Sequence, residues 1–277
     1  MSPTLSVCVP ALDAGRTLEA TLRSLLDQDV DFELVVLDNA STDRTAEIAR
    51  SFDDPRLRYH RNLSILPIGA NWNRAVQLSH GELVKVVCAD DILLPGALSR
   101  QVAVMDDPSV AVSSSRFRVI DEAGAVLEDG LGLPGLVGDR SARTLLRTLV
   151  RRGPADFGPT AAAMFRRALV DRVGGFRGDL VFPMDIDLVA RTGVFGRFAG
   201  LPQVLAAWRH SSFNLCATTS TVSKLREQWR FHHRLGAEYP ALLGAVDVVR
   251  GDARLARTVL HRARVRATAA VTGGSTA

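Results

Sequence analysis

The sequence predicts an α/β protein with a mostly parallel sheet, helices on both faces of that sheet and a helical C-terminal extension. In the first half of the chain, short runs rich in β-branched residues alternate with longer segments of helical periodicity. The short runs are apolar on both faces, as strands are when helices cover a parallel sheet from both sides. Beyond residue 220 the pattern is wholly helical.

Four pairs of a strand and a helix follow one another in this first half. The predicted strands are LSVCV, FELVVL, RLRYH and LVKVVC, and the predicted helices are TLEATLRSLLDQ, DRTAEIARSF, GANWNRAVQLS and LPGALSRQVAVM. Sheets of this kind bind ligands at the carboxyl ends of their strands. A site is therefore expected where VPALDAG follows the first strand, LDNASTD the second and CADD the fourth.

The second half continues with less regular patterns. VAVSSSRFRVIDEAG indicates a strand that runs into a turn, and the glycine-rich residues 124–139 are predicted to form a loop, which could act as a mobile flap. The remaining predicted elements are a helix (SARTLLRTLVRR), a strand (TAAAMFRR), a GGF turn, a second helix (MDIDLVARTGVFG) and a strand (QVLAAWRH).

The basic character of the chain lies at its carboxyl end. The formal net charge is +4, and the residues from Thr221 onward contribute +6 through ten Lys or Arg and four Asp or Glu, so the first 220 residues carry −2. A slightly acidic body lacks the basic and aromatic surface that nucleic-acid binding requires. The sequence therefore argues against a nucleic-acid partner.

The sequence predicts a cytoplasmic, unprocessed protein. Its apolar runs are far shorter than the roughly 20 residues that cross a bilayer, and Asp13 falls where an apolar signal segment would continue. Cys8, Cys88 and Cys216 are odd in number and show no C-x-x-C spacing. They are predicted to be buried thiols, not a disulfide framework or a structural zinc site.

Asp90 and Asp91 end the apolar run ELVKVVCADDILLPGAL. Two carboxylates at a strand edge repel each other and raise each other's pKa unless a cation, N–H donors or water offset their charge. Taken alone, the pair has a simpler interpretation, in which Asp91 caps the turn into the next helix and Asp90 is solvated beside it.

The segment LDNASTD, after the second predicted strand, can also be interpreted either as a helix cap or as part of a binding site. Ser41, Thr42 or Asp43 is predicted to cap the following helix, which leaves Asp38 without a structural role. A carboxylate and a helix N-terminus at the same edge as Asp90 predict a polar pocket that can accept a hydrogen bond from a nucleobase.

Four ordered segments resemble family 2 glycosyltransferases, which have the fold called GT-A (Rossmann-like). They are LSVCVPALDAGRTLEATLRSLLDQ, ELVVLDNASTD, GANWNRAVQLSHGELVKVVCADDILLPGAL and GGFRGDLVFPMDIDLVARTGVFGRFAGLPQVLAAWRH. The resemblance covers about residues 4–215. It implies a GT-A-like domain over residues 1–220, with a basic helical extension over 221–277. It also implies a nucleotide-sugar donor, a divalent cation (Mg²⁺ or Mn²⁺), inversion at the anomeric carbon and a carboxylate base.

The resemblance also implies roles for particular residues. The donor-binding residues are expected to be Pro10, Ala11, Leu12, Asp13, Asp38, Asn73, Asp90 and Asp91. Asp90 and His210 are the expected metal ligands, and Asp185 is the expected general base. A cation would stabilise the departing diphosphate, and one base suffices for a single inverting displacement. A lone histidine is often structural, so His210 keeps that alternative.

Two positions depart from the family pattern. Cys88 stands at the first position of the usual Asp-x-Asp, and Met184 replaces the first member of an acidic pair that ends at Asp185. Asp187 is a rival base, although an ion pair with Arg191 one helical turn later is the favoured interpretation of that residue. Asp185 itself could serve as a helix cap after a proline.

The predicted function is an inverting, metal-assisted glycosyltransferase, with two alternatives kept open. Cys88 and Met184 allow a nucleotide-sugar-binding protein that has lost catalysis, and a sugar nucleotidyltransferase is less favoured because no glycine-rich triphosphate loop follows the first strand. The acceptor is open. The basic tail predicts either a solvated helical face or an interfacial helix on anionic lipid, near a lipid-linked acceptor. A homo-oligomer is also compatible with the tail.

Overall fold

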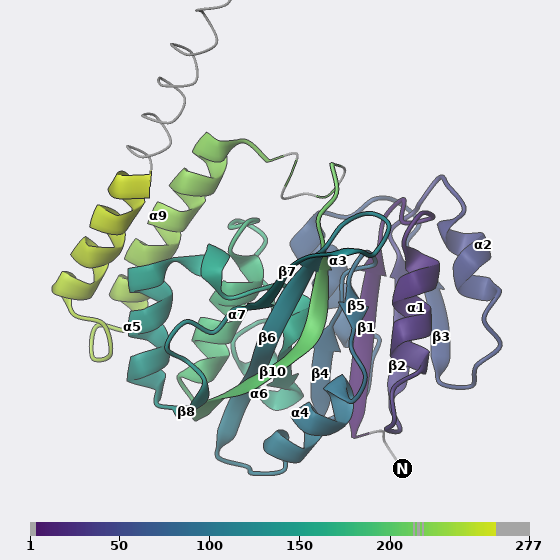
Figure 1. Ribbon diagram of the computed structural model, residues 1–277, viewed down its shortest axis with the longest axis horizontal. Helices are drawn as coiled ribbons and strands as arrows, with labels where there is room; N and C mark the ends of the chain where they lie inside the picture. The colour runs from purple at the N-terminus through teal and green to yellow at the C-terminus, as the bar shows by residue number, and fades with distance from the viewer. Residues whose placement is uncertain (1–3, 213, 215–216, 218, 259–277) are drawn as a thin grey trace, which may run out of the picture.

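The computed structural model describes residues 4–212, 214, 217 and 219–258. Its centre is one sheet with helices on both faces (Figure 1). The predicted α/β fold class is confirmed. Cys216 and residues 259–277 of the predicted extension lie outside the described residues.

The sheet is parallel in its first half and mixed in its second. The strands are β1 (Leu5–Ala11), β2 (Glu33–Asp38), β3 (Leu57–Arg61), β4 (Leu83–Val86), β5 (Ile92–Leu93), β6 (Val110–Ile120), β7 (Val126–Leu131), β8 (Gly138–Arg140), β9 (Ala163–Arg166) and β10 (Arg197–Arg209). Their order is β3-β2-β1-β4-β9-β6-β10-β5, and β3 to β4 are all parallel. β9 runs antiparallel between β4 and β6, whereas β10 is parallel to β6. The predicted parallel strands thus form one half of the sheet.

The helices follow the predicted pattern closely. They are α1 (Leu18–Leu26), α2 (Thr45–Arg50), α3 (Ile68–Gln77), α4 (Ala97–Met105), α5 (Ala142–Arg152), α6 (Arg167–Arg172), α7 (Met184–Gly193) and α9 (Thr221–Glu238), with short 3-10 turns at Pro154–Asp156 and Thr160–Ala162 and a further helical stretch over residues 245–258.

Each face of the sheet has its own hydrophobic core, which explains why the parallel strands are apolar on both sides. On one face, Leu22 of α1 and Leu98 of α4 pack in a cluster with Val7 of β1. On the other face, Leu145 of α5 lies in a cluster with Cys8, the neighbour of Val7 on the same strand. Successive side chains of a strand point to opposite faces, so a single strand serves both cores.

One cation lies inside a strand that is otherwise apolar. Lys85 of β4 is 1% exposed, and its Nζ donates to Oε1 of Gln101 at 2.6 Å and to the carbonyl of Ala163 at 3.1 Å. Burial lowers the pKa of Lys85 to about 7. These bonds tie β4 to α4 and to β9, at the boundary between the parallel and antiparallel parts of the sheet.

Residues 124–139 are not a plain loop, which corrects the prediction. Residues 126–131 form β7 on β6, and residues 138–140 form β8 on β10. Glycines suggested irregular structure, but pairing to a neighbouring strand depends on backbone groups that glycine retains. Gly132 has φ +91°, and a Cβ there would lie 2.9 Å from the ring of Phe117, so this position requires glycine. Cys88 is also half-buried and not buried as predicted, because it lies at the sheet edge.

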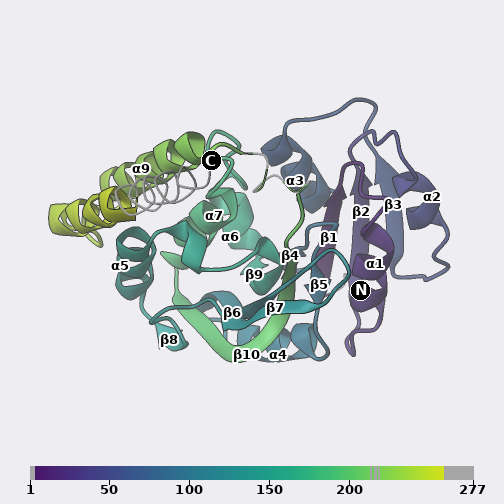
Figure 2. The same cartoon turned by 45° about the horizontal axis from the view of Figure 1, so that its top comes forward.

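The described part of the extension packs on α5 (Figures 1 and 2). Phe231 and Leu235 of α9 are fully buried in the same cluster as α5 leucines. Asp247, 2% exposed, receives hydrogen bonds from Arg147 and Arg151 of α5. Burial raises the pKa of Asp247, but the arginine hydrogen bonds outweigh it and leave that pKa lowered. The domain boundary at residue 220 stays a prediction.

Candidate active site

The carboxyl ends of β1 and β2 form one linked edge. β1 pairs with β2 so that Ala11 lies opposite Asp38. Beyond them, the N–H of Asp13 donates to Oγ of Ser41 at 3.0 Å, and Oδ1 of Asp13 accepts from the N–H of Thr42 at 2.8 Å. Asp13 has a φ of +46°, an uncommon value for a residue with a side chain. The hydrogen bonds hold this strained turn in place.

Asp90 and Asp91 lie at the same edge, after β4, beside Cys88. The Cys88 sulfur and one oxygen from each carboxylate lie within 4.8 Å of one another, and among the described residues this is the group that could hold a metal ion. Asp91 is 1% exposed, and its Oδ2 has no hydrogen-bond partner. Its Oδ1 accepts a 3.3 Å bond from the backbone N–H of Arg209.

The charge of this pair is only partly offset. Burial raises the pKa of Asp90. Burial and the adjacent Asp90 charge together raise the pKa of Asp91 well above its usual value. Arg209 acts in the opposite direction on both carboxylates without cancelling the rise. Buried carboxylates with an unused oxygen suit a bound cation, which would stabilise their ionised forms.

Arg209 and two threonines hold the segment, and sequence reasoning missed all three. The buried Arg209 side chain donates to the carbonyls of Asp90, Asp121 and Glu122 at 2.9–3.0 Å. Thr17, which precedes α1 at the cap position, and Thr21 of α1 both donate to the carbonyl of Ala89, at 2.8 and 3.0 Å. In the sequence, the only signal for Arg209 was its position beside His210.

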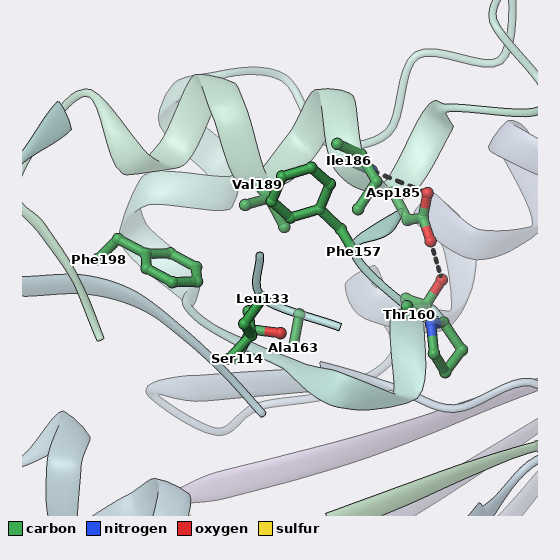
Figure 3. A pocket seen from close by; sticks show the side chains of 11 residues that line it. Ser114, Leu133, Phe157, Thr160, Ala163, Asp185, Ile186, Val189 and Phe198 are labelled. Atoms are coloured by element: carbon green, nitrogen blue, oxygen red, sulfur yellow. Dashed lines mark hydrogen bonds between the residues drawn. The ribbon is translucent and has the colours of Figure 1, made fainter. Parts of the chain in front are cut away.

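Asp185 lies in the first turn of α7, half-buried at the rim of an apolar hollow (Figure 3). Its Oδ2 accepts from Oγ1 of Thr160 at 3.0 Å, and its Oδ1 accepts from the N–H of Ile186 at 2.8 Å. The hollow is lined by Phe157, Val189 and Phe198, among others. Burial raises the pKa of Asp185 to about 6, although the two hydrogen bonds act against it.

The charge of Asp185 also contributes to the raised pKa of Asp91, although less than burial and the Asp90 charge do. The alternative role of Asp185 as the helix cap is not supported, because Pro183 occupies the cap position.

Asp187 is fully buried and has a structural partner, as predicted. Its Oδ2 accepts from Nε of Arg191 at 2.7 Å, and both side chains are almost completely buried. Arg191 donates further to the carbonyls of Val173 and Gly175 at 2.8 and 2.7 Å. Burial raises the pKa of Asp187, and Arg191 offsets part of the rise.

The remaining predicted donor residues differ in their surroundings. Pro10 and Ala11 are buried within β1, whereas Leu12 is 46% exposed. The amide of Asn73 is engaged with the backbone of Phe176, donating at 2.9 Å and accepting at 2.7 Å, so the structure gives it a local structural contact.

Asp38 is fully buried, and both of its oxygens have partners. Oδ1 accepts from the N–H of Ser41 at 2.8 Å, and Oδ2 accepts from the hydroxyl of Tyr59 at 2.8 Å and from Arg61. Burial raises the pKa of Asp38, but these hydrogen bonds and the Arg61 charge outweigh it and leave the pKa lowered. The ionised Asp38 therefore holds Arg61 at the strand edge.

His210 follows β10 and is exposed. Its backbone N–H donates to the carbonyl of Ile120 at 2.8 Å, and its ring lies 5.7 Å from that of Trp208. It is not part of the group formed by Cys88 and the two aspartates. Its predicted role as a metal ligand stays a prediction.

Two solved structures have this fold. The Staphylococcus aureus protein TarS, residues 1–349 with UDP-GlcNAc, has a TM-score of 0.66 and 19% identity, over 85% of this chain and 67% of that chain. The mannosyltransferase PcManGT from Pyrobaculum calidifontis, with GDP-Man and Mn²⁺, has a TM-score of 0.63 and 22% identity, over 100% of this chain and 82% of that chain. The GT-A-like fold predicted from the sequence is thereby confirmed.

Sequence comparison gives the family. The model for glycosyl transferase family 2 matches residues 6–174. The uncharacterized protein MT1568 of Mycobacterium tuberculosis is 34% identical over 218 residues, which cover 76% of this chain and 68% of that protein. The succinoglycan biosynthesis protein ExoU of Rhizobium meliloti is 31% identical over 202 residues, 67% of this chain but only 55% of ExoU.

The chain therefore belongs to glycosyl transferase family 2. The predicted enzyme class, a nucleotide-sugar-dependent glycosyltransferase, is confirmed. Asp185 and Arg209 lie beyond the residues that the family model matches. Among the described residues, no helix combines the length and apolar character needed to cross a membrane.

The two aspartates of α7 should respond oppositely to substitution. The Asp185 pKa is raised in the folded protein to about 6, so its ionised form costs stability above that pH, and the cost disappears below the unfolded pKa. Asp185→Asn should therefore raise the free energy of unfolding by ~1–3 kcal/mol at pH ~8 and leave it almost unchanged at pH ~4. Urea denaturation at both pH values measures this.

Asp187→Asn is the matched comparison. It leaves Arg191 buried without its carboxylate, so the free energy of unfolding should fall by about 3 kcal/mol at neutral pH. Equal destabilisation by the two substitutions at pH ~8 would show that Asp185 is also a structural residue, against the distinction drawn from their contacts.

Proposed function

We propose that this protein transfers a sugar from a nucleotide-sugar donor to an acceptor hydroxyl, with inversion at the anomeric carbon and Asp185 as general base. The observation that carries the proposal is the group of Cys88, Asp90 and Asp91 at the end of β4, which could hold a metal ion. The charge of this group is only partly offset by Arg209, and the negative charge of Asp185 makes the smallest of the contributions that raise the pKa of Asp91. Asp185 also has the raised pKa that a base near neutral pH requires.

Asp185 is well placed to accept a proton. Thr160 and Ile186 each donate one hydrogen bond to its carboxylate, which fixes the orientation of both oxygens. A carboxylate oxygen has more than one lone pair, so an acceptor hydroxyl can still donate to it. The apolar hollow behind it limits access of water and keeps the carboxylate basic.

Asp90 and Asp91 are the residues that would hold a divalent cation, with Cys88 beside them. Bound there, such a cation supplies positive charge to the departing nucleoside diphosphate. Arg209 and the α1 threonines fix the backbone that carries these ligands. The donor is expected to lie over the edge formed by Leu12, Asp13 and the Asp38 loop.

The nucleotide and the acceptor are less defined than the reaction class. TarS was solved with UDP-GlcNAc and PcManGT with GDP-Man. Both nucleotide sugars are therefore suitable donors for a first test. A Campylobacter jejuni relative, 37% identical over 35% of this chain, is named as a glucosyltransferase acting on an undecaprenol-diphosphate-linked glycan. That name supports a lipid-linked acceptor as the first one to assay.

The exposed face of the C-terminal helices supports contact with a membrane surface. Val246 and Val249 are 61% and 64% exposed, and Arg250 and Arg257 are exposed on the same helical stretch. Apolar side chains interleaved with arginines suit the interface of an anionic bilayer. We propose that this face brings the enzyme to a lipid-linked acceptor.

The alternative, a donor-binding protein without catalysis, rests on Cys88 and Met184. Met184 is buried and lies in the hydrophobic core, so it offers no chemistry at the site. Asp185 nevertheless retains the raised pKa and the exposure of a base. These features favour the enzyme.

Asp185→Asn should lower the transfer rate about 10²-fold or more, because it removes the basic oxygen but keeps the size of the side chain. Donor affinity, measured by calorimetry with UDP-GlcNAc and GDP-Man, should change little. Asp187→Asn, if folded, should keep most of its transfer activity and serves as the matched control. If only Asp187→Asn loses sugar-transfer activity, Asp187 and not Asp185 is the general base.

The rate of transfer should also depend on pH in one direction. Because the pKa of Asp185 is raised to about 6, the base is ionised above that pH and protonated below it. The logarithm of kcat should fall with a slope of about one as pH drops through this region, and it should level off above it. A flat profile in a protein that stays folded would mean that Asp185 is not the base.

Membrane contact should depend on the exposed valines. Val246→Ser with Val249→Ser should weaken binding to vesicles containing anionic lipid at low salt by about tenfold, measured by co-sedimentation. The control is Val126→Ser with Leu127→Ser on β7, two other exposed apolar residues. If unsubstituted protein does not bind such vesicles, the lipid proposal is wrong. Truncation at residue 220 is less informative, because it removes the buried Phe231.

A further inference from the structure

The ligand group at the end of β4 differs chemically from a set of carboxylates alone. It combines the sulfur of Cys88 with one oxygen from each of Asp90 and Asp91, all within 4.8 Å. A second observation is independent of this grouping. Asp91 is 1% exposed, yet its Oδ2 has no hydrogen-bond partner. A buried carboxylate oxygen without a partner is costly unless a ligand satisfies it.

We propose that Cys88 is a ligand of the cation at this site, so that the site prefers borderline divalent cations such as Zn²⁺ and Co²⁺ to Mg²⁺. This inference rests on the proposed function, because it concerns the cation of that same site. It adds the identity of a third protein ligand and the class of metal that this ligand selects.

The chemistry of sulfur carries the preference. Mg²⁺ and Mn²⁺ favour oxygen ligands, whereas a thiolate favours softer ions and binds Zn²⁺ strongly. On coordination, sulfur forms a bond to the metal and its proton leaves to solvent, with no change of oxidation state. A cysteine in place of the family aspartate therefore changes which metal binds best and retains the negative charge of the ligand.

The geometry is compatible with this set. Zn–S and Zn–O bonds of about 2.3 and 2.0 Å place two ligands of a tetrahedral ion ~3.6 Å apart. Ligand atoms within 4.8 Å of one another can reach that separation by small side-chain rotations. The Arg209 side chain donates to the backbone carbonyl of Asp90, and the backbone N–H of Arg209 donates to Oδ1 of the Asp91 side chain, so both residues are held in place. Three protein ligands also leave a coordination position for a diphosphate oxygen.

The other cysteines provide controls. Cys8 is completely buried within β1, and its thiol donates to the carbonyl of Ala75 at 3.5 Å, so it is enclosed in the core. Cys216 lies outside the described residues. Cys216→Ser therefore tests whether a sulfur signal comes from a thiol other than Cys88.

The test is a Co²⁺ titration of the full-length protein, alone and with UDP or GDP, followed by near-ultraviolet absorbance. A Co²⁺–thiolate bond absorbs there by charge transfer from sulfur, and Co²⁺ bound only to oxygen does not. Wild type and Cys216→Ser should show a stoichiometric band that Zn²⁺ abolishes by displacement, and Cys88→Ser should lack it. In Cys88→Asp, the ratio of Zn²⁺ to Mn²⁺ affinity should fall about tenfold or more.

Thermal unfolding of each variant establishes that it is folded before the comparison, and Cys88→Asp provides a second variant if Cys88→Ser does not fold. Calorimetric binding of Co²⁺ without the band, or a band that persists in Cys88→Ser, would overturn the inference and leave the proposed cation site intact. If neither Mn²⁺ nor Co²⁺ binds, alone or with either nucleotide, the cation in the proposed function fails as well.

Discussion

The pairing of a buried carboxylate, Asp91, with the half-buried Asp90 at the end of β4 is the constraint on which the rest of the site depends. Asp91 is almost completely enclosed, and Asp90 raises its pKa further. A protein retains such an arrangement at a cost in stability, because ionised groups lose hydration when they are buried. Such a cost is consistent with a site whose charge is balanced by a bound ligand.

Those contacts come from distant parts of the chain. Two α1 threonines bind the carbonyl of Ala89, and Arg209 at the end of β10 binds the carbonyl of Asp90. Asp185, in the first turn of α7, accepts a hydrogen bond from Thr160. The end of β4 is thus held by residues from widely separated parts of the chain, although the family model matches only residues 6–174.

Much of the fold could be predicted because hydrophobic periodicity is local. The parallel strands pack against a hydrophobic core on each face, so their sequences are apolar at successive positions. Lys85 is the exception in one of these runs. β7 and β8 could not be predicted, because these strands are stabilised by backbone hydrogen bonds to β6 and β10 and not by a pattern in their own side chains. The ion pair of Asp187 could be predicted because its partner, Arg191, is four residues away on the same helix.

The site was predictable only where residue type and position coincide. Asp90 and Asp91 follow from their position at a strand end, whereas the assignment of Asp185 follows from the resemblance to the family. Asp38 and Asn73 were predicted in the same way. Their polar atoms have hydrogen-bond partners that are distant in the sequence, Tyr59 and Phe176, and only the folded structure reveals them.

Arg209 has a consequence for how this enzyme can diverge. Its guanidinium contacts the main-chain carbonyls of Asp90, Asp121 and Glu122 and none of their side chains. A carbonyl is present whatever residue occupies the position. Arg209 therefore holds the turn after β6 through its main chain, and the Asp121 side chain adds a further bond by accepting from the N–H of Ala125 at 2.8 Å. Only the arginine itself is irreplaceable in this arrangement, because lysine lacks the planar fork that reaches several carbonyls together.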